Sequence, residues 1–152
     1  MIEDKTNLHR LVWSPDDFDG NNLLPSAFRK EDLSGNPESF ISVSRIDKLT
    51  PKFEQNTANS QFDKYVNDQS KRNEAWSITF NSGELRLIKC SKNRQPFNVT
   101  AQTENGNPAH CGIRNISGLK GRSYINELRT LLVSVSKNKI PLTQFLEKLP
   151  NE

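Results

Sequence analysis

The sequence predicts an α+β domain built on a mainly antiparallel sheet. Short apolar segments separated by turn residues are typical of strands, and two longer segments have the apolar spacing of helices. The helices do not alternate regularly with the strands, which favours an antiparallel sheet over a parallel one. The 152 residues show no repeat and no linker. We therefore expect one domain over residues 1–152, with one mid-chain helix and a C-terminal helical segment.

Two strands and a helix are predicted in the first half of the chain. Residues 8–14 contain Leu8, Leu11, Val12 and Trp13 and end at Ser14-Pro15, which predicts a strand. Residues 40–44 mix apolar and small polar residues, close to the alternation of a half-buried strand. Turn residues separate them, above all over residues 16–22. Thr50 followed by Pro51 predicts a helix start, because a hydroxyl caps the first turn and proline suits the first helical position. Apolar residues at helical spacing follow, so we expect a surface helix that buries one face.

The middle of the chain has the strongest hairpin pattern in the sequence. Strands are predicted over residues 75–80 and 85–88, joined by the turn residues 81–83. Two further strands are predicted over residues 97–101 and 111–113. These segments are expected to complete the sheet.

The C-terminal segment is predicted to contain two helices. After a cap at Ser123, apolar residues recur at helical spacing until Lys137. Pro141 then opens a second, shorter helix. We expect the first helix to close the protein's own core, and the second to be the better candidate for docking on a partner protein. The candidate contact residues of this second helix are Phe145, Leu146 and Leu149.

The basic residues are concentrated in the second half of the chain. The sequence has 21 Lys and Arg against 18 Asp and Glu, a formal net charge of +3, and acidic residues become rare after Glu84. This distribution favours an anionic partner such as a nucleic acid, although a basic face that meets only solvent is the alternative. Aromatic residues on neighbouring predicted strands, including Trp76 and Phe97, could stack bases, although they also suit a core. The candidate binding residues are Arg86, Lys89, Lys92, Arg94, Arg114 and Arg122.

Two cysteines and two histidines are too few, and too irregularly spaced, for a disulfide scaffold or a zinc motif. The phosphate-binding glycine motifs are also absent, so we expect no metal and no cofactor. The N-terminal residues lack the pattern of a secretion signal, and no apolar run could span a bilayer. We therefore expect a cytoplasmic protein without membrane contact, whose oligomeric state the sequence leaves open.

The segment around His110 is the most unusual local stretch. His110 and Cys111 follow a turn and precede Arg114. One hypothesis is a polar pocket in which His110 acts as an acid, a base or an anion contact while Arg114 binds an acidic group. Cys111 is not expected to serve His110 as a nucleophile, because successive strand residues point to opposite faces. The alternative is a structural turn that leads into an edge strand.

A second constellation combines Arg10, Ser44 and Glu84, with Ser42 beside Ser44. An arginine, a strand serine and a strand glutamate in this order resemble the three-part pattern of ADP-ribosyltransferases, although the longer motifs around those positions are missing. The resemblance implies that the arginine and the serine hold a nicotinamide dinucleotide and that the glutamate orients the reacting sugar. The alternative is that all of them are ordinary strand residues.

These patterns favour a small binding or accessory module that acts with a protein or nucleic-acid partner, such as a toxin–antitoxin or defence component. The alternative is an ADP-ribosyltransferase-like enzyme with Arg10, Ser44, Glu84 and His110 as candidate catalytic residues. Whether the protein is an enzyme stays open at the level of sequence, since many active sites have no linear signature.

Overall fold

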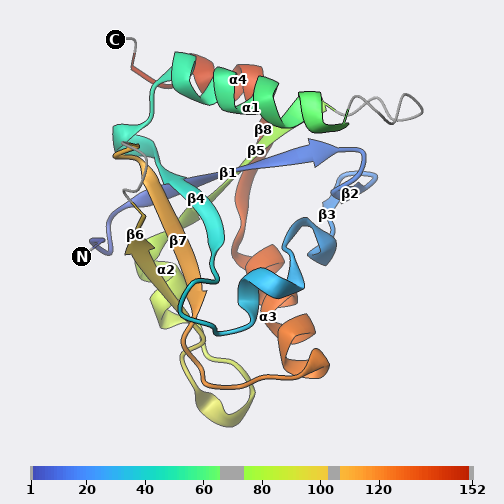
Figure 1. The fold of residues 1–152 in the computed structure, drawn as a ribbon, viewed down its shortest axis with the longest axis vertical. Coiled ribbons are helices and arrows are strands. Elements are labelled where there is room, and N and C mark those ends of the chain that lie inside the picture. The colour runs from blue at the N-terminus through green and yellow to red at the C-terminus, as the bar shows by residue number, and fades with distance from the viewer. Residues whose placement is uncertain (1, 66–73, 103–106, 151–152) are drawn as a thin grey trace.

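A six-stranded antiparallel sheet forms the centre of the computed structural model, which describes residues 2–65, 74–102 and 107–150 (Figure 1). Its spatial order is β6-β7-β4-β1-β5-β8. The strands are β1 (Asn7–Ser14), β4 (Ile41–Arg45), β5 (Glu74–Asn81), β6 (Phe97–Ala101), β7 (His110–Asn115) and β8 (Lys137–Pro141). A separate hairpin consists of β2 (Phe18–Asp19) and β3 (Asn22–Leu23). The prediction of an α+β fold with a mainly antiparallel sheet is confirmed.

Helices pack on both faces of the sheet (Figure 1). The α-helices are α1 (Pro51–Tyr65), α2 (Ser82–Leu87), α3 (Arg122–Val135) and α4 (Leu142–Glu147). Short 3₁₀ turns are η1 (Pro25–Ala27), η2 (Lys30–Leu33), η3 (Ile46–Lys48) and η4 (Ser91–Asn93). The mid-chain helix begins as the sequence predicts, because Thr50 Oγ1 accepts a hydrogen bond from the Phe53 backbone N–H.

The alternation of β1 divides the core between two layers. Leu8 and Val12 point to one face, where they pack in a cluster with the buried Leu128 and Leu132 of α3. Leu11 points to the other face and packs against a second cluster supplied by α1 and α4. In this second layer α1 and α4 lie side by side across one half of the sheet (Figure 1). The half formed by β4, β7 and β6 presents polar residues on this face, among them the exposed Ser42.

The prediction of a second hairpin strand over residues 85–88 is wrong. Ser82–Leu87 forms the helix α2, because the Asn81 side chain accepts a hydrogen bond from the Glu84 N–H at 3.0 Å and caps the first turn. The helix buries Leu85 and leaves Leu87 exposed. The neighbours of β5 are therefore β1 and β8, which come from distant parts of the chain.

The strand β8 is absent from the sequence prediction, which reads Lys137 only as the end of the preceding helix. Its residues are mostly exposed, and it lies at the edge of the sheet beside β5. Lysine and proline at an edge protect the unpaired backbone groups from other strands, so an edge strand of this kind lacks an apolar pattern. The predicted helix cap at Ser123 is also wrong, since Gly121 occupies the N-cap position of α3.

Candidate functional site

Two segments that are distant in sequence meet at one end of the molecule, at the bottom of Figure 1. Residues 89–94 surround the turn η4, and residues 117–124 lead into α3. Arg94 Nη1 donates to the Ser117 carbonyl at 2.8 Å, and Lys92 Nζ lies 5.5 Å from the centre of the Tyr124 ring. We refer to these two segments together as the basic end.

The basic end has a high density of positive charge. Neither of its segments contains an aspartate or a glutamate. Glu127 of α3 contacts the basic end from outside the two segments, where it accepts a hydrogen bond from the Ser91 N–H at 2.7 Å. The basic side chains of the two segments are all on exposed residues: Lys89, Lys92, Arg94, Lys120 and Arg122.

Local backbone geometry fixes the turn that carries Lys92. The Cys90 N–H donates to the Arg94 carbonyl and the Asn93 N–H donates to the Cys90 carbonyl, at 2.9 and 3.1 Å. Lys92 and Asn93 have positive φ angles of 65° and 55°. A non-glycine residue with positive φ is uncommon and points to a local requirement. These hydrogen bonds and dihedral angles fix the backbone of the turn, and the Lys92 ammonium lies over the Tyr124 ring.

Asn115 organises the second segment of the basic end, and its role has no signal in the sequence. Its Oδ1 accepts hydrogen bonds from the N–H and the hydroxyl of Ser117, and its Nδ2 donates to the Leu33 carbonyl at 2.9 Å. Asn115 and Ser117 are buried, so these bonds anchor the loop that leads to Lys120. A hollow of about 340 Å³ opens beside this loop and is lined by residues that include Lys120 and Arg114.

Four of the six predicted basic binding residues lie at the basic end: Lys89, Lys92, Arg94 and Arg122. Arg86 lies apart from them, because its guanidinium contacts Asp4 at 2.7 Å and donates to Asn98 Oδ1. Arg114 is also engaged, since its Nε donates to Thr100 Oγ1 at 2.9 Å and its Nη1 donates to the Pro37 carbonyl. Arg86 and Arg114 thus connect parts of the fold.

His110 and Arg114 share a polar face of the sheet with Phe40. His110 Nε2 lies 2.8 Å from Ser42 Oγ, and the Phe40 ring contacts both the His110 ring and the Arg114 guanidinium. The ring lies over Gly112, where an added Cβ would be 2.7 Å from Phe40. These residues therefore form an interlocked polar surface, and Arg114 at its margin also lines the hollow beside Lys120.

Cys111 lies on the opposite face from His110, as the strand geometry predicts. It is fully buried in the core cluster, and desolvation raises the pKa of its thiol. A buried thiol with a raised pKa is a poor nucleophile. Both cysteines are free and buried, and no group of metal-ligating side chains occurs among residues 2–65, 74–102 and 107–150.

Arg10, Ser44 and Glu84 are not brought together. Ser44 pairs with His9 across β1 and β4, so it shares a face with His9, and Arg10 points to the other face. Arg10 donates to the carbonyls of Ser42 and Ala27. Glu84 lies at the start of α2 and contacts Lys137.

The predicted docking helix faces inward. Phe145 and Leu149 are buried, and Leu146 is partly buried against the same cluster. The Phe145 ring stacks on the His9 ring with a centroid distance of 4.3 Å. The apolar side of α4 is therefore covered by the protein itself.

His9 belongs to a buried polar group that sequence reasoning missed. Its Nδ1 lies 2.7 Å from Ser77 Oγ, and its Nε2 lies 2.5 Å from Glu54 Oε2. His9, Ser77 and Glu54 are each at most 3% exposed. Substrate cannot reach side chains so deeply buried, so the group connects β1, β5 and α1 within the core.

Comparisons with protein-family models, curated proteins and solved structures give no match to this chain.

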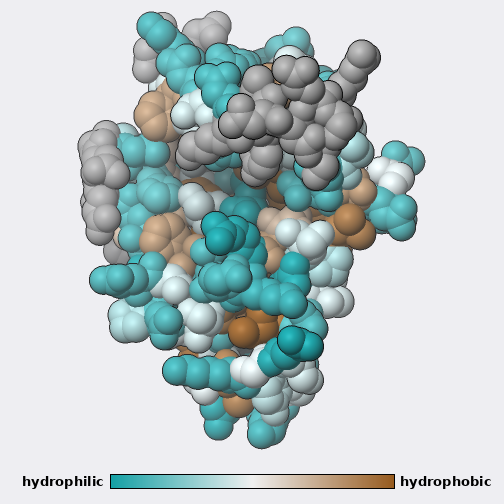
Figure 2. All heavy atoms as spheres, turned by 45° about the vertical axis from the view of Figure 1, so that its right-hand side comes forward, coloured by the Kyte–Doolittle hydropathy of each residue, from teal (hydrophilic) through white to brown (hydrophobic). Residues whose placement is uncertain are grey.

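None of the helices that the structure describes is long and apolar enough to cross a membrane. The face in Figure 2 is mostly hydrophilic, and its hydrophobic residues form separate small spots.

Proposed function

We propose that the protein binds the phosphate backbone of a nucleic acid through its basic end. The observation that carries this proposal is the meeting of residues 89–94 and 117–124, which places five exposed cations together without an aspartate or glutamate in either segment. Lys and Arg side chains that neutralise phosphates supply most of the affinity in nonspecific nucleic-acid binding.

The contacts within the basic end favour a preorganised surface. The Arg94–Ser117 bond and the Asn115 hydrogen bonds fix the backbone of both segments before a ligand arrives. Binding then orders only the exposed ends of the lysine and arginine side chains, which limits the entropy cost. The half-exposed Tyr124 ring lies beneath the Lys92 ammonium, and this cation–π contact helps to hold Lys92 at the basic end.

Phosphate contacts alone carry no sequence information, so we expect binding with weak sequence preference and strong salt dependence. The pattern of exposed cations over two loops suits a single strand, which can follow an irregular surface. Fluorescence anisotropy with labelled single-stranded RNAs of different sequence, each at several salt concentrations, measures both the sequence preference and the salt dependence.

Two variants with the same change in net charge test whether the nucleic acid binds at the basic end. The triple variant K92Q/K120Q/R122Q removes three cations from the basic end, and K30Q/K52Q/K148Q removes three exposed cations from elsewhere. Both changes lower the formal net charge from +3 to 0. We expect the first variant to weaken binding at least about tenfold and to reduce the salt slope by roughly two, and the second to retain the wild-type slope.

Equal losses in the two triple variants would contradict a localised site. A partner recovered from cell extract in equal amounts with and without nuclease, together with absent RNA and DNA binding, would favour a protein partner instead. The positions of Arg10, Ser44 and Glu84 give no support to the alternative of an ADP-ribosyltransferase-like enzyme.

A further inference from the structure

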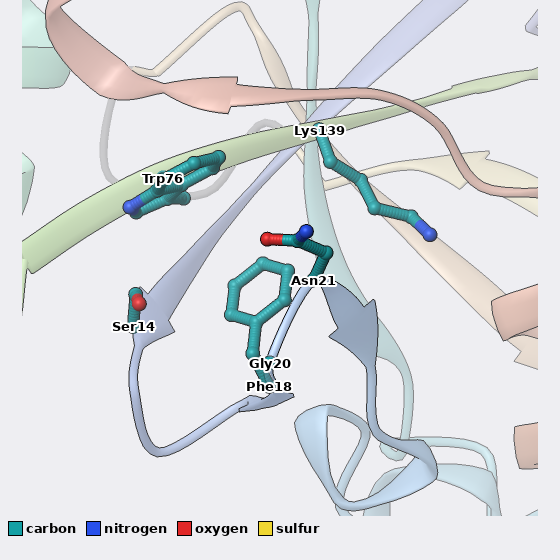
Figure 3. A pocket seen from close by; sticks show the side chains of 6 residues that line it. All are labelled: Ser14, Phe18, Gly20, Asn21, Trp76 and Lys139. Atoms are coloured by element: carbon teal, nitrogen blue, oxygen red, sulfur yellow. The ribbon is translucent and has the colours of Figure 1, made fainter.

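A second pocket lies beside the β2–β3 hairpin and is built from other elements than the basic end (Figure 3). Its volume is about 300 Å³, near the lower end of the range of roughly 300–1,000 Å³ for small-molecule sites. This size suits a single ring system. The lining residues are Ser14, Phe18, Gly20, Asn21, Trp76 and Lys139.

Two aromatic rings form the apolar part of this pocket. The Phe18 and Trp76 ring centroids are 5.6 Å apart with an angle of 56° between the planes. In Figure 3 the two rings lie near each other on the side of Ser14, while the Lys139 side chain extends on the far side of Asn21. A flat ligand can pack on such aromatic surfaces while its edge reaches the polar residues.

The polar side chains of the pocket have unused hydrogen-bonding capacity. Within the described part of the chain, Ser14 Oγ, the Asn21 amide and Lys139 Nζ make no hydrogen bond or ion pair with protein groups. They offer an ammonium donor, an amide that donates and accepts, and a hydroxyl that does both. Groups of this kind orient a ligand that has acceptors and donors on its edge.

Trp76 is an unusual choice for its position if it serves only the core. Its Nε1 is shielded from solvent and has no hydrogen-bond partner among the described residues. Buried tryptophan usually finds an acceptor, and an unsatisfied buried donor is destabilising. A phenylalanine or leucine would fill the core without this donor, so a requirement for the broad indole surface explains the residue.

The charges around the pocket select against charged ligands. Lys139 is the charged lining residue, and it repels a cation. The exposed Asp19, next to the lining residue Gly20, repels an anion such as a phosphate. Both effects favour an uncharged ligand with a polar edge.

From this geometry we infer that the pocket binds an uncharged planar heteroaromatic ring, of the nucleobase class. The ring packs on Phe18 and Trp76, and its edge meets the Asn21 amide and the Lys139 ammonium. This inference does not rest on nucleic-acid binding by the basic end, because the two sites share no residue.

Tryptophan fluorescence tests the inference directly, since the chain has two tryptophans. In a W13F variant the signal comes from Trp76 alone. Titration with adenosine, guanosine, cytidine and uridine is expected to give a saturable change for at least one of them, whereas ribose gives none. The same nucleoside is expected to bind about tenfold more weakly to N21A and K139A, the effect of one lost hydrogen bond or charge contact. The matched controls N22A and K52A, which lie outside the pocket, are expected to bind normally.

The nucleoside 5′-monophosphates separate ring recognition from phosphate recognition. We expect the monophosphate of the best nucleoside to bind no more tightly than the nucleoside, and the K92Q/K120Q/R122Q variant to bind it normally. No saturable change with any nucleoside, a much tighter monophosphate, or equal binding by N21A, K139A and the controls would each overturn the inference. Failure of RNA binding at the basic end leaves all these readouts unchanged, so the two proposals fail separately.

Discussion

The Nε2 atom of His9 lies 2.5 Å from Glu54 Oε2 in the layer between the sheet and α1, where both side chains are almost fully buried. On its other side the His9 ring meets Ser77 and stacks on Phe145. Through its contacts with Glu54 and Phe145, His9 joins α1 and α4 to the central strands. Removal of either partner leaves a polar side chain buried without its counterpart.

Glu54→Ala is therefore expected to destabilise the fold by roughly 3 kcal/mol, the usual cost of breaking a buried pair by removing one member. Gln55→Ala changes the next residue of α1, which is exposed, and is expected to cost less than about 0.5 kcal/mol. Urea denaturation measures both free energies of unfolding. Equal values for the two variants would show that the buried contact is not important for stability.

Position 112 has no room for a side chain, because the Phe40 ring lies where a Cβ of residue 112 would project. Gly112→Ala is expected to destabilise the protein by about 1–3 kcal/mol, as overpacking does. The double variant F40A/G112A has room for the new methyl group, so its loss is expected to be smaller than the sum of the two single losses. Additive losses in thermal or urea unfolding would contradict the close contact.

The Asn81 cap that creates α2 has a specific test. Asn81→Ala removes the acceptor for the Glu84 N–H and is expected to cost about 1 kcal/mol, whereas Asn81→Asp keeps an acceptor and most of the stability. Chemical denaturation of both variants gives the comparison. An aspartate variant as unstable as the alanine variant would argue against capping.

Asp17 gives the stability a pH dependence of a definite sign. Burial raises the pKa of its carboxyl above the usual 3.8, although the backbone N–H of Trp13 opposes this effect. The folded state therefore holds this proton more tightly than the unfolded state, and the contribution to stability is present at low pH and lost as pH rises through the folded pKa. Asp17→Asn removes the cost of burying a charge and keeps an acceptor for Trp13.

We accordingly expect Asp17→Asn to raise the free energy of unfolding at pH 7, with a gain over wild type that shrinks towards pH 3. Asp19→Asn, on an exposed residue of the same loop, is the control for a simple change of net charge. A gain that is independent of pH, or one shared equally by Asp19→Asn, would be inconsistent with burial as the cause.

Local patterns in the sequence were sufficient to predict much of the sheet and the start of α1. The apolar residues within 8–14, which end at Ser14-Pro15, and the Thr50-Pro51 step depend on neighbours in the chain, so they can be read directly. The helix α2 could not be distinguished from a turn, because Asn81-Ser82-Gly83 suits both. The edge strand β8 has no apolar pattern, since its two lysines, Lys137 and Lys139, are exposed.

The candidate site shows the same division between local and long-range information. Lys92 and Arg94 could be selected as candidate binding residues from the distribution of charge along the sequence. Their position beside residues 117–124 depends on the Arg94–Ser117 bond and on Asn115, which connect residues far apart in the chain. The separation of Arg10 from Ser44 likewise follows from strand register, which the sequence does not specify.

Amide chemical-shift mapping with a short single-stranded RNA is the most direct test of the basic end as a nucleic-acid-binding surface. We expect the shifts to concentrate in residues 89–94 and 117–124, to saturate at low salt and to disappear as salt is raised, while residues of α1 stay unchanged. Shifts spread evenly over exposed lysines, or absent from these two segments at low salt, would contradict it.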